Sequence, residues 1–192
     1  MTRRRSRPWT VTLLAGVGVA IAARELPFVN WQRVVPPVDA RPLTIRHDAK
    51  GDGRFGAPRS GHRSHRGIDL VAPLHSPVRA IRSGRVVEVG THKGLGRFIR
   101  LQHPGRLHSL YAHLEEVKVK SGARVRQGEV IGTVGKTGNA RHAWITPHLH
   151  LEVLQSGTPL DPKAIGLIAL APGVRDAPAH DDNEEDEDAG GG

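Results

Sequence analysis

The alternation of histidine and leucine over His148, Leu149, His150 and Leu151 could carry chemistry. Residues 148–153 predict a β-strand, in which successive side chains point to opposite faces. His148 and His150 then share one face, while the two leucines share the other. Two adjacent imidazoles backed by apolar side chains favour the binding of a metal ion and its water over packing alone.

A second pair of polar residues, His65 and Asp69, is separated by four positions. On a helix or in an extended segment this spacing brings both side chains to about the same face. The apolar residues 70–72 stop at Pro73, which favours a short strand after a glycine turn. Catalytic zinc sites use three protein ligands and keep one position open for water, and zinc accepts histidine and carboxylate. We therefore predict one Zn²⁺ on His65, Asp69 and His150.

His113 is the next candidate, because it follows a β-rich run and precedes Glu115-Glu116, which we expect to form a turn. Together with His148 it could flank a metal-activated water. One histidine would accept a proton and the other would stabilise the developing oxyanion. The remaining histidines are expected to be surface or core residues: His47, His62, His75, His92, His103, His108, His142 and His180.

These motifs occur in an order that resembles the lysostaphin/LytM-type zinc endopeptidases, which cleave peptide bonds in peptidoglycan. The resemblance rests on His-x-x-x-Asp at 65–69, Tyr-Ala-His-Leu at 111–114 and His-Leu-His at 148–150. The segment Phe55-Gly56-Ala57-Pro58-Arg59 is also similar to the one before the family's first ligand. The resemblance extends over residues 53–162, most of the chain after its N-terminal segment.

The resemblance implies that three of these side chains bind zinc and that two histidines are catalytic. The implied ligands are His65, Asp69 and His150, and the implied catalytic residues are His113 and His148. It further implies a mostly antiparallel β-sheet with a groove across it, and peptidoglycan as the substrate.

Residues 139–147 depart from the family pattern, because many members have a shorter, glycine-containing connection there. This loop should border the groove, where Arg141 and Trp144 could influence the choice of substrate. A surface loop with Trp144 covering the sheet fits the sequence equally well.

Short β-rich segments separated by glycines fill the middle of the chain, at 85–89, 97–102, 108–114, 117–120, 130–134 and 148–154. This spacing favours antiparallel hairpins and leaves no room for helical crossovers. We therefore predict an all-β domain over residues 44–165, within which residues 117–134 resemble half of a lipoyl-type hairpin. A linker over 24–43 is expected before it.

Residues 1–23 have the pattern of a secretory signal, with four arginines before an apolar stretch. The stretch is shorter than the ~20 residues of a membrane-spanning helix. A cleaved signal peptide and an uncleaved N-terminal anchor both fit. We expect a location in the cell envelope, periplasmic or extracellular, with membrane contact only if the segment is uncleaved.

The charge is unevenly distributed along the chain. Residues 24–175 contain 24 Lys and Arg against 11 Asp and Glu, a net of +13, whereas residues 166–192 predict a disordered acidic tail. A basic body suits an anionic partner, and a signal segment makes an anionic cell wall a better candidate than nucleic acid. The absence of cysteine excludes disulfides and thiolate-bound zinc.

Three other function classes deserve comparison with a peptidase. A non-catalytic regulator of other peptidoglycan hydrolases is the main alternative, with an envelope protein as its partner, but the complete set of five site residues argues against it. A lipoyl-type carrier would need a lysine at a hairpin tip, and Lys136 lacks the usual flanking residues. A nucleic-acid binder is not expected, because there is no recognition-helix pattern and no aromatic platform.

Overall fold

The computed structural model describes residues 30, 32–49 and 51–170. The predicted signal or anchor segment lies outside these residues, as does the tail from residue 171 onward. Within the described part of the chain, no helix is long and apolar enough to cross a membrane.

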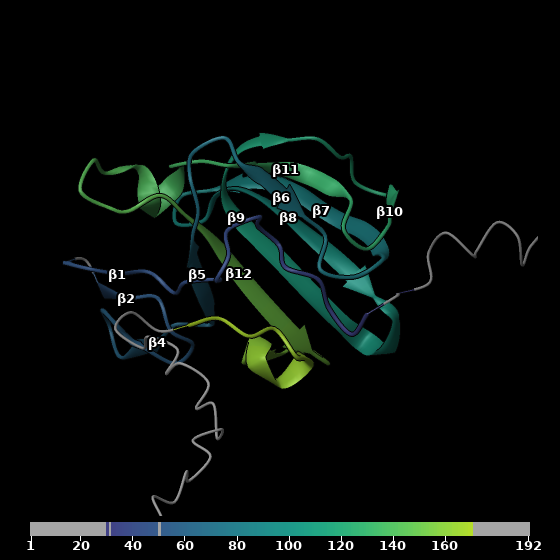
Figure 1. Cartoon of the computed structure of the whole chain (residues 1–192), viewed down its shortest axis with the longest axis horizontal. Helices are drawn as coiled ribbons and strands as arrows, with labels where there is room; N and C mark the ends of the chain where they lie inside the picture. Colours follow the sequence, from purple (N-terminus) through teal and green to yellow (C-terminus); the bar gives the residue numbers. More distant parts are fainter. Residues whose placement is uncertain (1–29, 31, 50, 171–192) are drawn as a thin grey trace, which may run out of the picture.

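A nine-stranded antiparallel sheet forms the body of the protein (Figure 1). Its central strands follow the order β10-β7-β8-β9-β11-β6, and β12 pairs with β9, β5 and β13. The strands are β5 (Gly67–Val71), β6 (Pro77–Arg79), β7 (Gly84–His92), β8 (Gly96–His103), β9 (Leu107–Val117), β10 (Arg124–Val125), β11 (Val130–Val134), β12 (His148–Gln155) and β13 (Thr158–Leu160). The prediction of an all-β, mostly antiparallel fold is therefore confirmed.

Two short hairpins and three 3-10 turns complete the described residues. The hairpins pair β1 (His47–Asp48) with β2 (Gly51–Asp52), and β3 (Pro58–Arg59) with β4 (Arg63–Ser64). The turns are η2 (Pro104–Arg106), η3 (Gly138–Arg141) and η4 (Pro162–Ile165). Figure 1 shows both hairpins and η3 at the same end of the sheet as the start of β12.

One expected strand, over residues 117–120, is absent from the structure. Strand β9 instead continues through Glu115 and Glu116, which we had expected to form a turn, and ends at Val117. The pairing of Glu116 with Thr133 and of Val117 with Gly132 on β11 keeps this stretch extended. The acidic pair therefore lies within a paired strand, and only single hydrogen bonds such as Lys118 N to Ile131 O continue beyond it.

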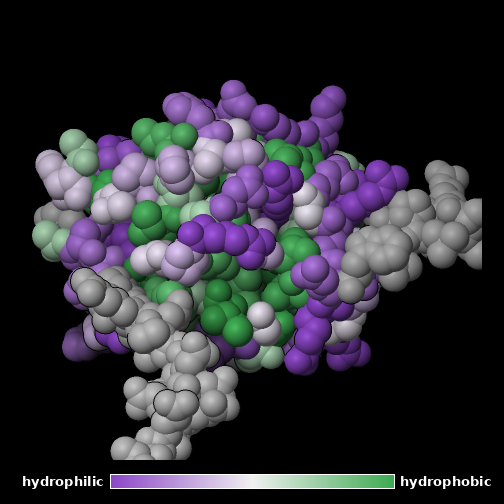
Figure 2. Space-filling view, in the orientation of Figure 1, coloured by the Kyte–Doolittle hydropathy of each residue, from purple (hydrophilic) through white to green (hydrophobic). Residues whose placement is uncertain are grey.

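The core lies on one face of the central strands. On β12, Leu149, Leu151 and Val153 are all fully buried, as the alternation predicted. Tyr111 on β9 is also fully buried, and its hydroxyl accepts a hydrogen bond from Ile81 N at 2.9 Å. In the view of Figure 2, hydrophobic side chains gather near the middle of the molecule and hydrophilic ones around its rim.

Residues on both sides of the predicted domain pack against the sheet. Val38 and Leu43, in the predicted linker, are buried members of the core. Leu167 and Leu170 follow the predicted end at 165; Leu167 is buried, and Leu170 forms a bridge with Thr44. Packing therefore extends beyond residues 44–165 in both directions.

Candidate active site

Strand β12 is the scaffold of the site because it lies between β5 and β9. Its register places His150 opposite Asp69 on β5 and opposite Ala112 on β9. His148, His150 and Glu152 alternate with the buried leucines and share the other face. Gly67 sits opposite Glu152, and a Cβ on this glycine would collide with the backbone carbonyl of Leu151. The close approach of β5 and β12 thus depends on a residue without a side chain.

Three side-chain atoms face one another at the end of these strands: His65 Nε2, Asp69 Oδ1 and His150 Nδ1. Asp69 Oδ1 lies 2.8 Å from His150 Nδ1 and 3.2 Å from His65 Nε2, and the two nitrogens are 3.0 Å apart. These separations are slightly shorter than the roughly 3.4 Å between ligand atoms around tetrahedral zinc. All three residues are buried. This donor set fits a single metal ion of the kind that prefers nitrogen and oxygen ligands.

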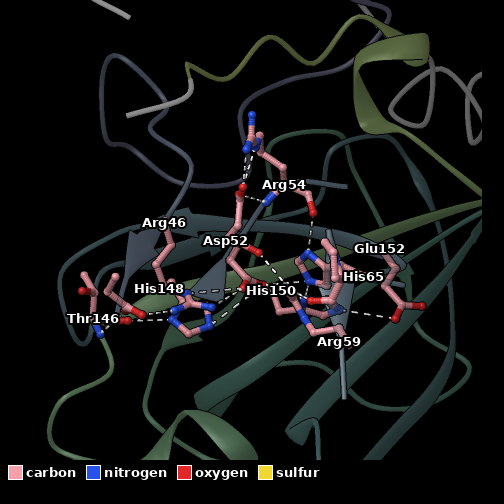
Figure 3. A network of polar contacts seen from close by, with 12 residues as sticks. Arg46, Asp52, Arg54, Arg59, His65, Thr146, His148, His150 and Glu152 are labelled. Atoms are coloured by element: carbon pink, nitrogen blue, oxygen red, sulfur yellow. Dashed lines mark hydrogen bonds and ion pairs between the residues drawn. The ribbon is translucent and has the colours of Figure 1, made fainter. Parts of the chain in front are cut away.

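The outward-facing nitrogens of both histidines are also hydrogen-bonded (Figure 3). His65 Nδ1 donates to the Arg54 carbonyl at 2.9 Å, and His150 Nε2 lies 3.3 Å from Glu152 Oε1. Carbonyl and carboxylate acceptors on the far nitrogen of a ligating histidine fix its tautomer and its orientation. His65 Nε2 and His150 Nδ1 are therefore the nitrogens left to share a cation.

Charges around Asp69 keep it ionised. Burial opposes ionisation, but the interactions of the carboxylate with His150 and His65 outweigh it and hold the pKa of Asp69 well below its usual range. The other oxygen, Oδ2, accepts hydrogen bonds from Arg46 at 3.0 and 3.3 Å. Oδ1 thus faces His65 and His150, while Oδ2 is bonded by the buried guanidinium of Arg46.

His150 has the opposite shift. Burial alone would lower its pKa, but the carboxylates of Asp69 and Glu152 raise the pKa of His150 to about 9. A proton or a metal ion is needed among three acceptor atoms this close together. Because metal ligands must be deprotonated, the two compete for Nδ1.

His113 reaches this face of the sheet through an irregularity in β9. In a regular strand His113 would share the side of Tyr111, which points into the core. The pairing of β8 with β9 shifts between Arg97 and Ile99, and His113 adopts a φ of 62°. The bulge turns His113 toward the site, where its ring centroid lies 5.0 Å from that of His148.

Backbone carbonyls orient both His113 and His148. His113 Nδ1 donates to Thr137 O at 2.9 Å, and His148 Nδ1 donates to Thr146 O at 2.6 Å. Burial, followed by the neighbouring His148 and His150, lowers the pKa of His113 to about 3. Burial also lowers the pKa of His148. Both rings are therefore neutral near pH 7, with an unprotonated Nε2 able to accept a proton.

All five predicted site residues line one cavity of about 690 Å³. From the unusual loop, Asn139, Ala140 and Ile145 line it too, whereas Arg141 and Trp144 are not among the lining residues. Trp144 is 61% exposed and stacks on His142, with ring centroids 5.0 Å apart. The loop borders the cavity as expected, but through different side chains.

Two supporting residues were missed by sequence reasoning. Glu152 continues the alternation of His148 and His150, so its place on the same face could have been predicted. Arg46 gives no comparable signal, because it lies 23 residues before Asp69 and reaches it only through the fold.

Residues 63–162 match the model for Peptidase family M23. The chain belongs to this family. The matched region contains all five predicted site residues, and the resemblance to lysostaphin-type peptidases is confirmed. The roles of the five residues stay predictions.

Relatives with known names agree with the M23 assignment. The chain is 36% identical over 105 residues to the peptidoglycan DD-endopeptidase ShyC of Vibrio cholerae. The matched stretch covers 55% of this chain and 23% of ShyC. A zinc-containing peptidase from Vibrio cholerae has a TM-score of 0.55 and 30% identity, over 74% of this chain and 41% of that one. The lysostaphin catalytic domain from Staphylococcus simulans has a TM-score of 0.52 and 33% identity, over 61% of this chain and 90% of that one. The chain spans about a quarter of the length of the curated relatives it matches.

Proposed function

We propose that this M23 chain is a zinc-dependent endopeptidase that hydrolyses peptide bonds in the stem peptides or cross-links of peptidoglycan. The observation that carries the proposal is the convergence of two groups on one cavity. His65, Asp69 and His150 direct three ligand atoms at one point, and the neutral rings of His113 and His148 lie beside them. The name of ShyC supports peptidoglycan as the substrate.

The ligand roles follow from the donor set. We assign His65 Nε2, Asp69 Oδ1 and His150 Nδ1 to zinc, with Glu152 and the Arg54 carbonyl fixing the two imidazoles. When bound, zinc supplies a Lewis acid that activates water and polarises a peptide carbonyl.

The two remaining histidines handle protons and charge. The Nε2 atoms of His113 and His148 are free to accept a proton, because each Nδ1 is committed to a carbonyl. One ring can take the proton of the attacking water, and the resulting imidazolium can donate it to the leaving amine. The other ring, once protonated at Nε2, stabilises the oxyanion of the tetrahedral intermediate. Which ring performs which step follows from how the peptide enters the cavity.

We further propose that the protein acts in the cell envelope, on the periplasmic or extracellular side. The arginines and the apolar stretch of residues 1–23 support export, and the basic body supports attachment to an anionic wall. A regulatory envelope protein stays a prediction.

The test is mass spectrometry of the material released from purified peptidoglycan by the purified protein, with and without a chelator. We expect new peptide termini that vanish with the chelator and return when zinc is added. An intact wall with tightly bound protein would instead favour a non-catalytic regulator.

A further inference from the structure

The two walls of the cavity differ in charge. One wall is formed by the β3–β4 hairpin and the residue after His65, and it carries the arginines Arg59, Arg63 and Arg66. The other wall is formed by the end of β7, the turn that follows it and the loop around η3. Its lining residues include no lysine, arginine or carboxylate: His92, Gly94, Leu95, Asn139, Ala140 and Ile145. Arg46 also lines the cavity, but it is paired with Asp48 and Asp69, so the other positive charges of the lining lie on the side of the hairpin and Arg66.

Arg59 and Arg63 are directly opposite each other in the β3–β4 hairpin. Directly opposed residues of an antiparallel pair project from the same face, and like charges in this position destabilise the pair. Both side chains line the cavity. An anion bound between the two guanidinium groups would relieve their repulsion.

Arg59 is held in place before any ligand binds. Its Nη1 donates to the carbonyl of Asp52 at 2.9 Å and to that of Pro58 at 3.2 Å. Its Nη2 lies 3.7 Å from Asp69 Oδ2, and the side chain is 27% exposed. Figure 3 shows Arg59 beside His65 and His150. The guanidinium is thus fixed next to the predicted zinc ligands, with part of its surface open to the cavity.

The nearby carboxylates are already committed to other groups. Asp52 pairs with Arg54, Asp69 Oδ2 is bonded by Arg46, and Glu152 lies against His150. Among the described residues, no carboxylate forms an ion pair with Arg63 or Arg66. Arg59 shares Asp69 with Arg46, at the longer distance of 3.7 Å, so the positive charge of this wall is only partly balanced by the described part of the protein.

We propose that Arg59 and Arg63 form a subsite for a free carboxylate of the peptide substrate, close to the bond that is cleaved. The inference rests on the proposed endopeptidase function and narrows it to peptides that carry a carboxylate on the side facing β3 and β4. A guanidinium suits this role, because its planar fork of donors matches the two oxygens of a carboxylate. Arg66 adds long-range attraction at the rim, and the neutral wall holds the uncharged part of the peptide.

The test uses two cross-linked peptides that differ only in one group near the cleaved bond, a free carboxylate or its carboxamide. Cleavage kinetics and calorimetric binding are measured for both peptides with the zinc-loaded protein. We expect kcat/KM and affinity to be about tenfold or more higher for the carboxylate form, as for a hydrogen bond to a charged group. Arg59→Gln should remove this preference mainly through KM, with unchanged zinc content. Arg63→Gln should reduce it.

Arg85→Gln is the matched control, because Arg85 lies on β7, away from the cavity, and bonds the Gly122 carbonyl. It should keep the full preference. If Arg59→Gln loses zinc, Arg63→Gln decides the matter. In the described part of the chain Arg63 forms no hydrogen bond or ion pair with a predicted zinc ligand, and its Nε donates to Ser60 O.

The outcomes separate the two proposals. Equal cleavage and equal binding of the two peptides by the wild type would overturn the carboxylate subsite and leave the endopeptidase standing. A retained preference in both arginine variants would overturn it as well. Tighter binding of the carboxylate peptide that depends on Arg59, without cleavage of either peptide, would support the subsite and contradict the endopeptidase.

Discussion

His113 and His150 lie on the same side of the sheet, with ring centroids 5.8 Å apart, although an unbroken β9 would turn His113 into the core. The left-handed backbone of His113 costs free energy that an ordinary strand residue would not pay. Such bulges are frequent beside active sites, where they redirect a side chain. His108 pairs with Leu154 in the same register that pairs Ala112 with His150, so His108 lies on the site face. The bulge turns His113 to that face as well.

Replacing His113 should separate chemistry from metal binding. We expect His113→Ala and His113→Asn to keep their zinc and to lose turnover by about 10²- to 10⁴-fold, the usual contribution of a general acid or base. Asparagine tolerates the left-handed conformation better than alanine, so the second variant controls for backbone strain. Zinc content and kcat on isolated peptidoglycan are the measurements. His108→Ala should remain active, and a fully active His113→Asn would contradict the assigned role.

Replacing His150 should act on the metal itself. His150→Ala removes one of the three converging atoms, and we expect tight zinc binding to be lost together with activity. The measurement is zinc stoichiometry by mass spectrometry of the metal after dialysis. His47→Ala, at an exposed position on β1, is the control and should retain one zinc per chain. A His150→Ala protein that keeps stoichiometric zinc would show that the ligand set is wrong.

Glu152 should influence the metal through His150. Removing the acceptor on His150 Nε2 by Glu152→Ala should weaken zinc binding about 10- to 100-fold, as expected for the hydrogen-bond partner of a ligating histidine. Glu152→Gln keeps an oxygen at that position and should lose less. Competition with a chromogenic chelator gives both affinities. Equal zinc affinity in the wild type and in Glu152→Ala would exclude this supporting role.

The free energy of unfolding should decrease at acidic pH because of His103, a buried histidine outside the site. Burial lowers the pKa of His103 to about 4, and both its nitrogens are hydrogen-bonded, to Ser83 O and Ser109 Oγ. The unfolded chain, with a histidine pKa near 6.5, binds the proton more readily than the folded one, so stability decreases as pH falls. His103 should contribute about 3 kcal/mol above pH 6.5 that is lost by about pH 4.

Urea unfolding at several pH values, in the presence of a chelator, checks this contribution. His103→Asn should be less stable at pH 7 and should show a shallower decline between pH 6.5 and 4. Parallel curves for the wild type and the variant would mean that His103 titrates alike in both states.

Alternation along single strands made much of the site predictable. His148, His150 and the buried leucines between them follow directly from the two-residue period of a strand, and Glu152 extends the same pattern. The pairing of His150 with Asp69 joins residues 81 positions apart, so it follows from no local period; it was predicted from the donor types that zinc accepts.

What could not be predicted depends on local irregularity and on distant contacts. The extended course of Glu115 and Glu116 follows from the pairing of Glu116 and Val117 with β11, which overrides the polar character of the two glutamates. The bulge at His113 leaves no mark in the sequence that we can identify. Arg46 reaches Asp69 through the packing of the N-terminal hairpin, which no periodicity describes.

The carbonyls of Thr137 and Thr146 bracket the η3 loop, and each accepts the hydrogen bond that aims one of the two histidines. The loop between them supplies part of the neutral wall of the cavity. The residues that line the cavity here and the carbonyls that orient the two histidines therefore belong to one stretch of backbone. Evolution can exchange or lengthen the loop's interior to suit a new peptide, but its two anchor points must stay where they are. An engineer who grafts a loop here inherits the same restriction.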